Sequence, residues 1–397
     1  MIKMTHILLI SHDIPSMSVG ATIPIYHMIK NLSTQYDITL VCFNSKKYDI
    51  KPLEKHLSNI ILLDNPVYDS FKDQFKYTFK NMLSYDNIKM HSFFNYYYHP
   101  NMSKIIKDTL RCDDYDIIIT DMPMAFYVKN IKKPKIVYAF DAVGDYNHHM
   151  AKKATSIQSK IYWYLNYMKI HQYEKCYNKF DECIVVNNKD KKLLERFIKT
   201  PISVVANGVD IEYFKNKNNR RIRQLIFVGD MSTPPNNDAV RYFVDEIYPL
   251  ILREVNIPFK IIGRNPTDYI KSLGDDPNIT VTGSVDDIRK HLNPGSIFIT
   301  PMISGTGIKN KILEAMSMNL TVVSTKIGIS GINAKNNHDF ILADTPIEFK
   351  DAILRVYNDD KLNRKIAENA RVFVKNNYSW QIASNKITHL IEKKTIK

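Results

Sequence analysis

One short stretch of the sequence combines glycines, lysines and a glutamate at the start of an apolar helix pattern. It reads SGTGIKNKILEAMSMN, occupies residues 304–319 and lies between two apolar runs typical of strands. The first N–H groups of a helix have no partner inside the helix, and with the helix dipole they attract an anion such as phosphate. Glycine lets the backbone approach such a ligand. The stretch therefore predicts an anion-binding turn that leads into a helix near Ile308.

The side chains of this predicted site differ in what they could contribute. The residues concerned are Gly305, Thr306, Gly307, Lys309, Lys311 and Glu314. The apolar residues at helical spacing, which should face the core, are Ile308, Ile312, Ala315 and Met316. This pattern places Glu314 on the polar side of the helix, where a carboxylate could accept hydrogen bonds from two ribose hydroxyls. A glycine-capped amphipathic helix with solvated charges would show the same spacing.

Other polar side chains directly follow predicted strands. His12 and Asp13 come after the apolar run 5–11, and Asp141 comes after the run 135–140, with Asp145 four residues later. Ligands of open α/β sheets bind beyond the carboxyl ends of the strands. Asp141 or Asp145 could orient a hydroxyl group or act as a base, and a helix cap would use the same residue type. For His12 and Asp13, both ligand contact and a simple loop role remain open.

Short apolar runs alternate with helical patterns through most of the chain, which indicates parallel sheets with crossover helices. The runs predicted as strands are 5–11, 37–43, 115–120, 135–140, 181–188, 202–210, 224–230, 259–263, 278–283, 296–301 and 320–325, with helices near 24–32, 236–255 and 285–292. The predicted fold class is α/β, with two Rossmann-like domains that face each other across a cleft. We expect an N-terminal domain over 1–203, a C-terminal domain over 204–374, and a last helix over 375–397 that returns to the first domain.

Composition narrows the partners without naming one. The net charge of +14 favours anionic ligands or surfaces, and the excess of lysine and arginine is spread along the chain. The four cysteines form no C-x-x-C pair, and His148 and His149 lack further ligands at suitable spacing, so no metal is expected. No nucleic-acid-binding motif is present. No apolar run is long enough for a signal peptide or a membrane span, which favours a cytoplasmic protein.

Two stretches mix aromatic residues with lysines. They cover residues 68–99 and 160–177. Each could form a surface that contacts an anionic membrane or a lipid-linked acceptor. A helix with an apolar core stripe and a charged outer face would have the same composition.

The segment GTGIKNKILEAMSMNLTVVSTKIGISGI closely resembles the donor-site segment of the group 1 (family 4) glycosyltransferases, which have the GT-B fold. VVANGVDIEYF at 204–214 resembles the hinge segment of that family, and LIFVGDMSTPPNNDAVRYFVDEIYPLI resembles the start of its C-terminal domain. The resemblance is more specific in the C-terminal half than in the N-terminal half. It is nearest to the sugar transferases of exopolysaccharide gene clusters.

The resemblance implies that the C-terminal domain binds a nucleotide-sugar donor and that the N-terminal domain binds the acceptor. Glu314 would bind the donor ribose. The other residues implied on the donor side are Gly20, Gly229, Arg264, Gly305, Thr306, Gly307, Lys309 and Lys311. His12 and Asp13 would lie on the acceptor side, with Asp141 or Asp145 as the catalytic carboxylate. The implied reaction is a retaining, metal-independent sugar transfer of the hexosyltransferase type, to a glycan or lipid-linked acceptor.

The sequence departs from the family pattern in two places. Many members carry a second acidic residue upstream of the helix glutamate, and the corresponding stretch ISGTG has none. The first-domain loop, usually Gly-Gly, is here Val19-Gly20. Two alternatives therefore stay open: a nucleotide-sugar 2-epimerase of the same fold, and a degenerate, non-catalytic nucleotide-binding protein.

Overall fold

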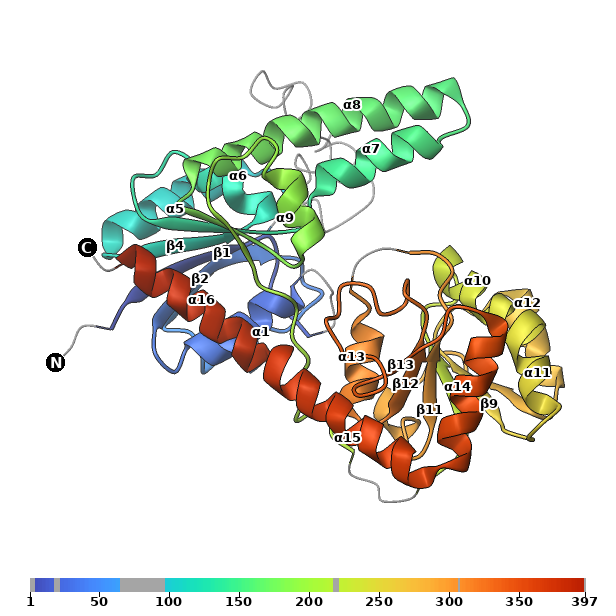
Figure 1. The fold of residues 1–397 in the computed structure, drawn as a ribbon. Helices are drawn as coiled ribbons and strands as arrows, with labels where there is room; N and C mark the ends of the chain where they lie inside the picture. The colour runs from blue at the N-terminus through green and yellow to red at the C-terminus, as the bar shows by residue number, and fades with distance from the viewer. Residues whose placement is uncertain (1–3, 18–21, 65–96, 217–220, 306–307, 396–397) are drawn as a thin grey trace. The chain divides into compact units, whose positions relative to one another are not determined.

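The computed structural model describes residues 4–17, 22–64, 97–216, 221–305 and 308–395. Its contacts divide the chain into two compact units (Figure 1). Unit 1 consists of residues 1–206 and 383–397, and unit 2 of residues 207–382. Each unit is built on a sheet whose neighbouring strands pair in parallel.

Unit 1 has a seven-stranded sheet in the order β3-β2-β1-β4-β5-β6-β7. The strands are β1 (His6–Ser11), β2 (Asp37–Asn44), β3 (Asn59–Asp64), β4 (Ile117–Asp121), β5 (Lys135–Phe140), β6 (Glu182–Val185) and β7 (Ile202–Val204). The helices are α1 (Ile23–Leu32), α2 (Lys51–Glu54), α5 (Pro100–Cys112), α6 (Ala125–Val128), α7 (Val143–Lys153), α8 (Ile157–Glu174) and α9 (Asn188–Leu194), with 3₁₀ turns η2 (Met122–Met124) and η3 (Lys175–Lys179).

Unit 2 has a six-stranded sheet in the order β10-β9-β8-β11-β12-β13. The strands are β8 (Leu225–Val228), β9 (Phe259–Ile262), β10 (Ile279–Val281), β11 (Ile297–Thr300), β12 (Thr321–Ser324) and β13 (Ile341–Leu342). The helices are α10 (Pro234–Tyr242), α11 (Tyr248–Leu252), α12 (Asp268–Ser272), α13 (Asn310–Ser317), α14 (Pro346–Asn358) and α15 (Asp360–Asn377), with the π-helical turn η4 (Phe243–Ile247) and the 3₁₀ turns η5 (Leu273–Asp275) and η6 (Ile288–Lys290).

The apolar runs in the sequence became the central strands because both faces of a parallel sheet are covered. Residues of β1, β4 and β5 such as Leu8, Ile118 and Val137 are fully buried in one core. Leu225, Phe259 and Ile299 occupy the equivalent core of unit 2. The prediction of two parallel α/β sheets is confirmed.

Three local predictions differ from the structure. The helix expected near Ile308 begins at Asn310, with Lys309 as its N-cap. The helix expected over 285–292 is only the 3₁₀ turn η6, whose N-cap Asp287 accepts a hydrogen bond from Arg289 N. Strands β3 and β13 were not predicted, since β3 is only half buried and β13 has two residues.

The last helix, α16 (Trp380–Thr395), belongs to unit 1 from residue 383 onward. Ala383, Ile387 and Ile391 are buried. Asn31 Nδ2 donates to Ser384 Oγ over 3.0 Å, which ties this helix to α1. Whether the two units are the acceptor and donor domains of the sequence prediction remains a prediction.

Candidate functional site

The ends of β8 and β9 meet through two glycines. A Cβ on Gly263, whose φ is +150°, would lie 1.7 Å from the carbonyl oxygen of Gly229. A Cβ on Gly229 would lie 2.7 Å from the Nδ2 of Asn236. Neither position tolerates a side chain without displacing its neighbour. Gly229, predicted to contact the donor, therefore has at least a packing role in bringing the strand ends together.

Arg264 follows this junction and is already paired. Its Nε donates to Asp230 Oδ2 over 2.7 Å, and Ser232 Oγ donates to Asp230 Oδ1 over 2.7 Å. The hydrogen bonds from Ser232 and Arg264 hold the pKa of Asp230 well below its usual range. Asp230 was not singled out from the sequence, although it is the last residue of a predicted strand. The structure thus places a carboxylate beside the arginine.

The turn before α13 is described only in part. Gly305 has a φ of +112°, in the region that favours glycine, so this position needs its lack of a side chain. Thr306 and Gly307 lie outside the described residues, as does Gly20. Lys309 caps α13, and burial lowers the pKa of its ammonium group. The predicted core stripe is confirmed for Ile312, Ala315 and Met316, which are fully buried.

Lys311 is not on a solvated face. Its Nζ donates to Asn236 Oδ1 over 2.8 Å and lies 4.1 Å from the centre of the Phe227 ring. Burial, followed by the nearby charge of Lys309, lowers the pKa of Lys311 to about 7. In the described part of the chain no carboxylate forms an ion pair with Lys311. A lysine in this position could pair with the anion of a ligand, because no described carboxylate pairs with it.

Glu314, expected on the polar side of the helix, is instead partly buried. Burial alone raises the pKa of its carboxyl to about 7. Among the described residues none donates a hydrogen bond to this side chain. A partly buried carboxylate without a donor is costly, and the hydroxyl groups of a ligand could satisfy it. Lys311 and Glu314 therefore lie on the same helix, and both are partly buried with no oppositely charged partner among the described residues.

In unit 1, the end of β1 is tied to the end of β4 through Asp121. Its Oδ2 accepts hydrogen bonds from Ser11 Oγ over 3.0 Å and His12 N over 2.8 Å, and it lies 2.7 Å from His12 Nδ1. Burial lowers the pKa of His12, but the charge and hydrogen bond of Asp121, with the charge of Asp13, more than offset this, so the pKa is raised. Asp121 is fully buried and was missed in the sequence. It follows an apolar run as Asp141 does, so the same signal could have found it.

Asp13 lies next to this pair and is also buried. Its Oδ1 accepts a hydrogen bond from Ile14 N over 2.8 Å. Burial raises the pKa of Asp13, while a hydrogen bond with Ser45 opposes that rise. The geometry gives Asp13 a role in shaping the loop. A contact of His12 or Asp13 with an acceptor remains a prediction.

Asp141 stands at the end of β5, as predicted, beside a carboxylate that was not foreseen. Its side chain is hydrogen-bonded to Asp190 of α9, and burial together with Asp190 raises the pKa of Asp141 to about 6. Phe140, just before it, has a φ of +63°, which is rare for a bulky residue. Strained backbone of this kind is often found at functional sites. Two carboxyl groups that share a hydrogen bond must hold a proton between them.

Asp145 lies on α7, with its Oδ2 3.9 Å from Lys189 Nζ. A third acid, Glu174, is 2% exposed, and its Oε1 accepts a hydrogen bond from Gly144 N over 3.0 Å. Burial raises the pKa of Glu174 to about 7. Glu174 was not predicted, because its partner is 30 residues away in the sequence. Its contacts give it the role of holding the first turn of α7.

No group of three or more potential metal ligands occurs in the described ranges. His148 stacks on Tyr167, with ring centres 4.8 Å apart, rather than approaching a carboxylate. Within the same ranges, no helix has the length and apolar character needed to cross a membrane.

Comparison with known proteins covers both units. Residues 222–359 match the family model described as glycosyl transferases group 1. A 44.6 kDa protein of the cps region of Klebsiella pneumoniae is 24% identical over 234 residues, which is 56% of this chain and 59% of that relative. The crystal structure of a glycosyltransferase from Rickettsia africae has a TM-score of 0.67 at 16% identity and covers 99% of both chains. HepE of Anabaena, crystallised with UDP, has a TM-score of 0.66 at 13% identity and covers 98% of this chain and 100% of its own.

At these identities the structural matches define the fold, and the fold is GT-B. These structures and the family match over residues 222–359 agree with the resemblance to group 1 glycosyltransferases that the sequence shows. The match to the group 1 glycosyltransferases extends over residues 222–359, and the chain as a whole shares the GT-B fold. The chain matches about three fifths of the length of the Klebsiella relative. Its activity, its substrates and the roles of its site residues are therefore matters for a proposal.

Proposed function

We propose that the protein is a retaining, metal-independent glycosyltransferase of the hexosyltransferase type. It would move a sugar from a nucleotide-sugar donor to a glycan or lipid-linked acceptor, with no part for nucleic acid. The donor would bind to unit 2 and the acceptor to unit 1. One observation carries the proposal: α13, inside the segment that matches the family, holds the partly buried Lys311 and Glu314, and no described residue provides a counter-ion for either.

A nucleotide sugar offers what both groups lack. Its diphosphate could pair with Lys311 and with the N–H groups at the start of α13. Its ribose hydroxyls could donate to Glu314. Transfer of the sugar leaves negative charge on the departing diphosphate, and fixed positive groups would stabilise that charge without rearranging. Support for this ligand class comes from HepE, whose structures contain UDP, UDP with glucose, and UDP-glucose.

On the acceptor side, Asp141 is the better of the two candidate catalytic carboxylates. Its raised pKa, near 6, suits a group that must hold and release a proton near neutral pH. It would orient the acceptor hydroxyl or accept its proton. Asp145, beside Lys189, would help to hold the start of α7 in place.

The setting we propose is surface polysaccharide or glycolipid synthesis in the cytoplasm, at the inner face of the membrane. The cps region that encodes the Klebsiella relative supports this setting. The main alternative is a degenerate nucleotide-binding protein, because the stretch before α13 lacks the second acidic residue of many family members. Turnover of donor in the presence of acceptor separates an active transferase from this alternative. A 2-epimerase would instead convert the donor without any acceptor.

A thermal-shift screen tests the donor site. The purified protein would be mixed with UDP-, GDP- and ADP-sugars and the free nucleotides, without metal. A ligand at 100 times its Kd stabilises the fold by about 2.7 kcal/mol, so one nucleotide should raise the midpoint clearly. Glu314→Ala should abolish the shift while Glu368→Ala, on the exposed face of α15, should keep it. A shift that survives Glu314→Ala, or no shift with any nucleotide, would contradict the proposal.

A further inference from the structure

Helices α7 and α8 form a hairpin in unit 1 (Figure 1). Aromatic contacts hold the two helices together: Tyr146 packs edge-on against Trp163, and His148 stacks on Tyr167. The turn between them occupies only residues 154–156. The hairpin is therefore a defined element whose two helices are held together by their own contacts.

An apolar stripe runs along α8, and its side chains are exposed. Its members are Ile157, Ile161, Tyr164, Leu165 and Met168, which are between 49% and 76% exposed. They recur at i, i+4, i+7, i+8 and i+11, so they lie within one third of the helix circumference. The buried residues of the same helix, Asn166, Ile170 and Tyr173, lie on the opposite side. A stripe with core spacing thus faces outward.

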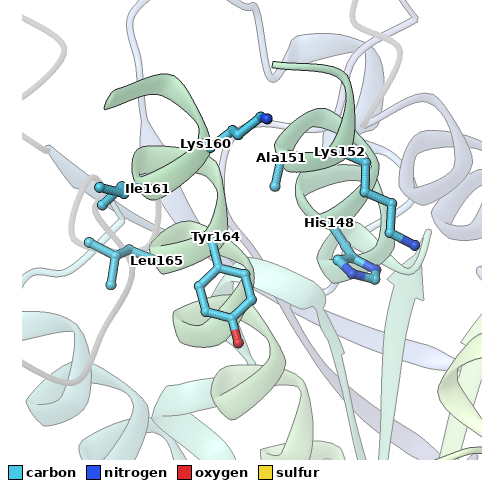
Figure 2. Close-up of a pocket in the computed structure, with 7 residues that line it drawn as sticks. All are labelled: His148, Ala151, Lys152, Lys160, Ile161, Tyr164 and Leu165. Carbon is cyan, nitrogen blue, oxygen red and sulfur yellow. The ribbon is translucent and has the colours of Figure 1, made fainter. Parts of the chain in front are cut away.

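An open groove of about 390 Å³ lies between the two helices beside this stripe (Figure 2). Its lining residues are His148, Ala151, Lys152, Lys160, Ile161, Tyr164 and Leu165. Figure 2 shows side chains of both helices around the groove, with the ammonium groups of Lys152 and Lys160 extending from its lining. The hollow could accept an apolar chain next to cationic groups.

The hairpin is basic along most of its length, and its two acids, Asp145 and Glu174, lie at the end away from the turn. Residues 146–173 contain four lysines and neither aspartate nor glutamate. At 100° per residue, Lys160 and Lys169 flank the apolar stripe on its two sides. Exposed apolar side chains between cations suit the boundary between lipid headgroups and acyl chains, where the lysines meet anionic headgroups. A second copy of the chain fits less well, because a symmetric contact would bring the lysines of the two hairpins together.

We propose that the α7–α8 hairpin docks the protein onto an anionic lipid bilayer, with the stripe of α8 entering the headgroup boundary. The reason for such docking, access to a membrane-borne acceptor, rests on the proposed function. The docking itself needs neither donor nor acceptor. Failure of the transferase proposal would therefore leave it standing, and the reverse also holds.

Co-sedimentation of the full-length protein with lipid vesicles tests the docking, without nucleotide. Vesicles of phosphatidylcholine alone are compared with vesicles in which about one third of the lipid is phosphatidylglycerol. Each lysine near an anionic surface adds about a fivefold factor to binding. Binding should require the anionic lipid and weaken in high salt. Absence of binding to the anionic vesicles would overturn the proposal.

Two sets of variants locate the contact. Ile161→Ser with Leu165→Ser removes part of the stripe, and Lys152→Ala with Lys160→Ala removes two cations. Both pairs should lower vesicle binding about tenfold or more. The matched controls are Ile347→Ser with Val372→Ser and Lys361→Ala with Lys365→Ala, which lie on exposed positions of unit 2 and should bind as the unchanged protein does. Thermal melting confirms that each variant is folded.

Two outcomes would reject the hairpin as the docking surface. If the hairpin variants bind vesicles as well as the controls do, another surface makes the contact. If light scattering instead shows a dimer that the Ile161→Ser, Leu165→Ser variant loses, a second copy of the chain covers the stripe.

Discussion

The charged groups at the strand ends of unit 1 differ from those on α13 of unit 2: the former have charged or hydrogen-bonded carboxyl partners, and the latter have no charged partner among the described residues. In unit 1, Asp121 pairs with His12, and Asp141 shares a hydrogen bond with Asp190. On α13 of unit 2, the described partners of Lys311, such as Asn236 and the Phe227 ring, are all neutral, and Glu314 has no donor among the described residues. Unit 1 satisfies its charges internally, whereas α13 presents two that remain to be satisfied.

This difference separates groups that position from groups that bind. A charge that is already paired adds little attraction for a ligand, but it fixes the geometry around it. A partly buried charge without a counter-ion destabilises the free protein, and the ligand that pairs with it recovers that free energy on binding. We therefore expect substitutions in unit 1 to cost stability and substitutions on α13 to cost affinity.

The largest expected loss of stability is that of Asp121→Ala. The change removes the acceptor that buried donors of Ser11 and His12 share, and breaking a buried pair of this kind costs about 3–5 kcal/mol. Because the folded-state pKa of His12 is raised, its favourable contribution is fully present below about pH 6.5 and is lost as pH rises through the higher folded value. Urea unfolding of Asp121→Ala should therefore show a larger deficit at pH 6 than at pH 9.

Ser11→Ala is the matched control for this change. It removes one of the donors to Asp121 and keeps the ion pair with His12, so it should cost only about 1 kcal/mol. Equal losses for the two variants would mean that the pairing with His12 contributes nothing. The claim that the charge pairs of unit 1 stabilise its fold would then be wrong.

Lys311→Met is expected to raise the stability of the free protein, whereas Asp121→Ala lowers it. Burial lowers the pKa of Lys311 to about 7, so removing the ammonium group should stabilise the free protein by roughly 1–3 kcal/mol after allowance for solvent and for the lost bond to Asn236. The penalty of a depressed lysine is complete below its folded pKa and shrinks as pH rises toward its unfolded value. The gain should thus be larger at pH 6 than at pH 9 in urea unfolding.

Lys365→Met, at an exposed position of α15, is the control for the general effect of removing a lysine, and it should change stability little. In the nucleotide screen, Lys311→Met should lose the shift that Lys365→Met retains. A Lys311→Met protein that is less stable and still binds nucleotide would show that Lys311 serves the fold and not a ligand.

The sequence indicated the positions of many of these charged groups, but not their partners or their burial. The apolar runs predicted most strands, and Asp141 and Arg264 stand at strand ends as expected. The partners Asp190 and Asp230 were missed, since which carboxylate meets which group is decided by how strands and helices pack. Burial of Glu314 was missed for the same reason: the helical pattern shows which face is polar, but not how closely neighbouring elements cover it.

Helices α13 and α8 make this limit concrete. Both carry apolar residues at core spacing, but Ile312 and Met316 of α13 are fully buried, whereas Ile161 and Leu165 of α8 are exposed. Periodicity predicts that a stripe exists. Whether the core or an outside partner covers it depends on the tertiary arrangement, which a single helix does not encode.

Asp141→Asn should change stability least, by less than about 1 kcal/mol, because the site is partly exposed and the amide can still donate to Asp190. The folded-state pKa of Asp141 is raised from 3.8 to about 6, so the protonated form is favoured in the fold. Stability of the unchanged protein should therefore fall slightly as pH rises from 4 to 6 (about two units), and this fall should vanish in the variant. Asp108→Asn, an exposed carboxylate of α5, should keep it.

The pH dependence of turnover tests whether Asp141 has a catalytic role in addition to its small effect on stability. If the ionised Asp141 orients the acceptor or takes its proton, turnover should rise as pH passes through about 6, and Asp141→Asn should lose that limb along with about 100-fold or more of the rate. If Asp141 only pairs with Asp190 to hold the end of β5 against α9, the rate should change little and the limb should remain. That result would make the Asp141–Asp190 pair a positioning device and would move the search for the base to His12, a further titratable group at a strand end.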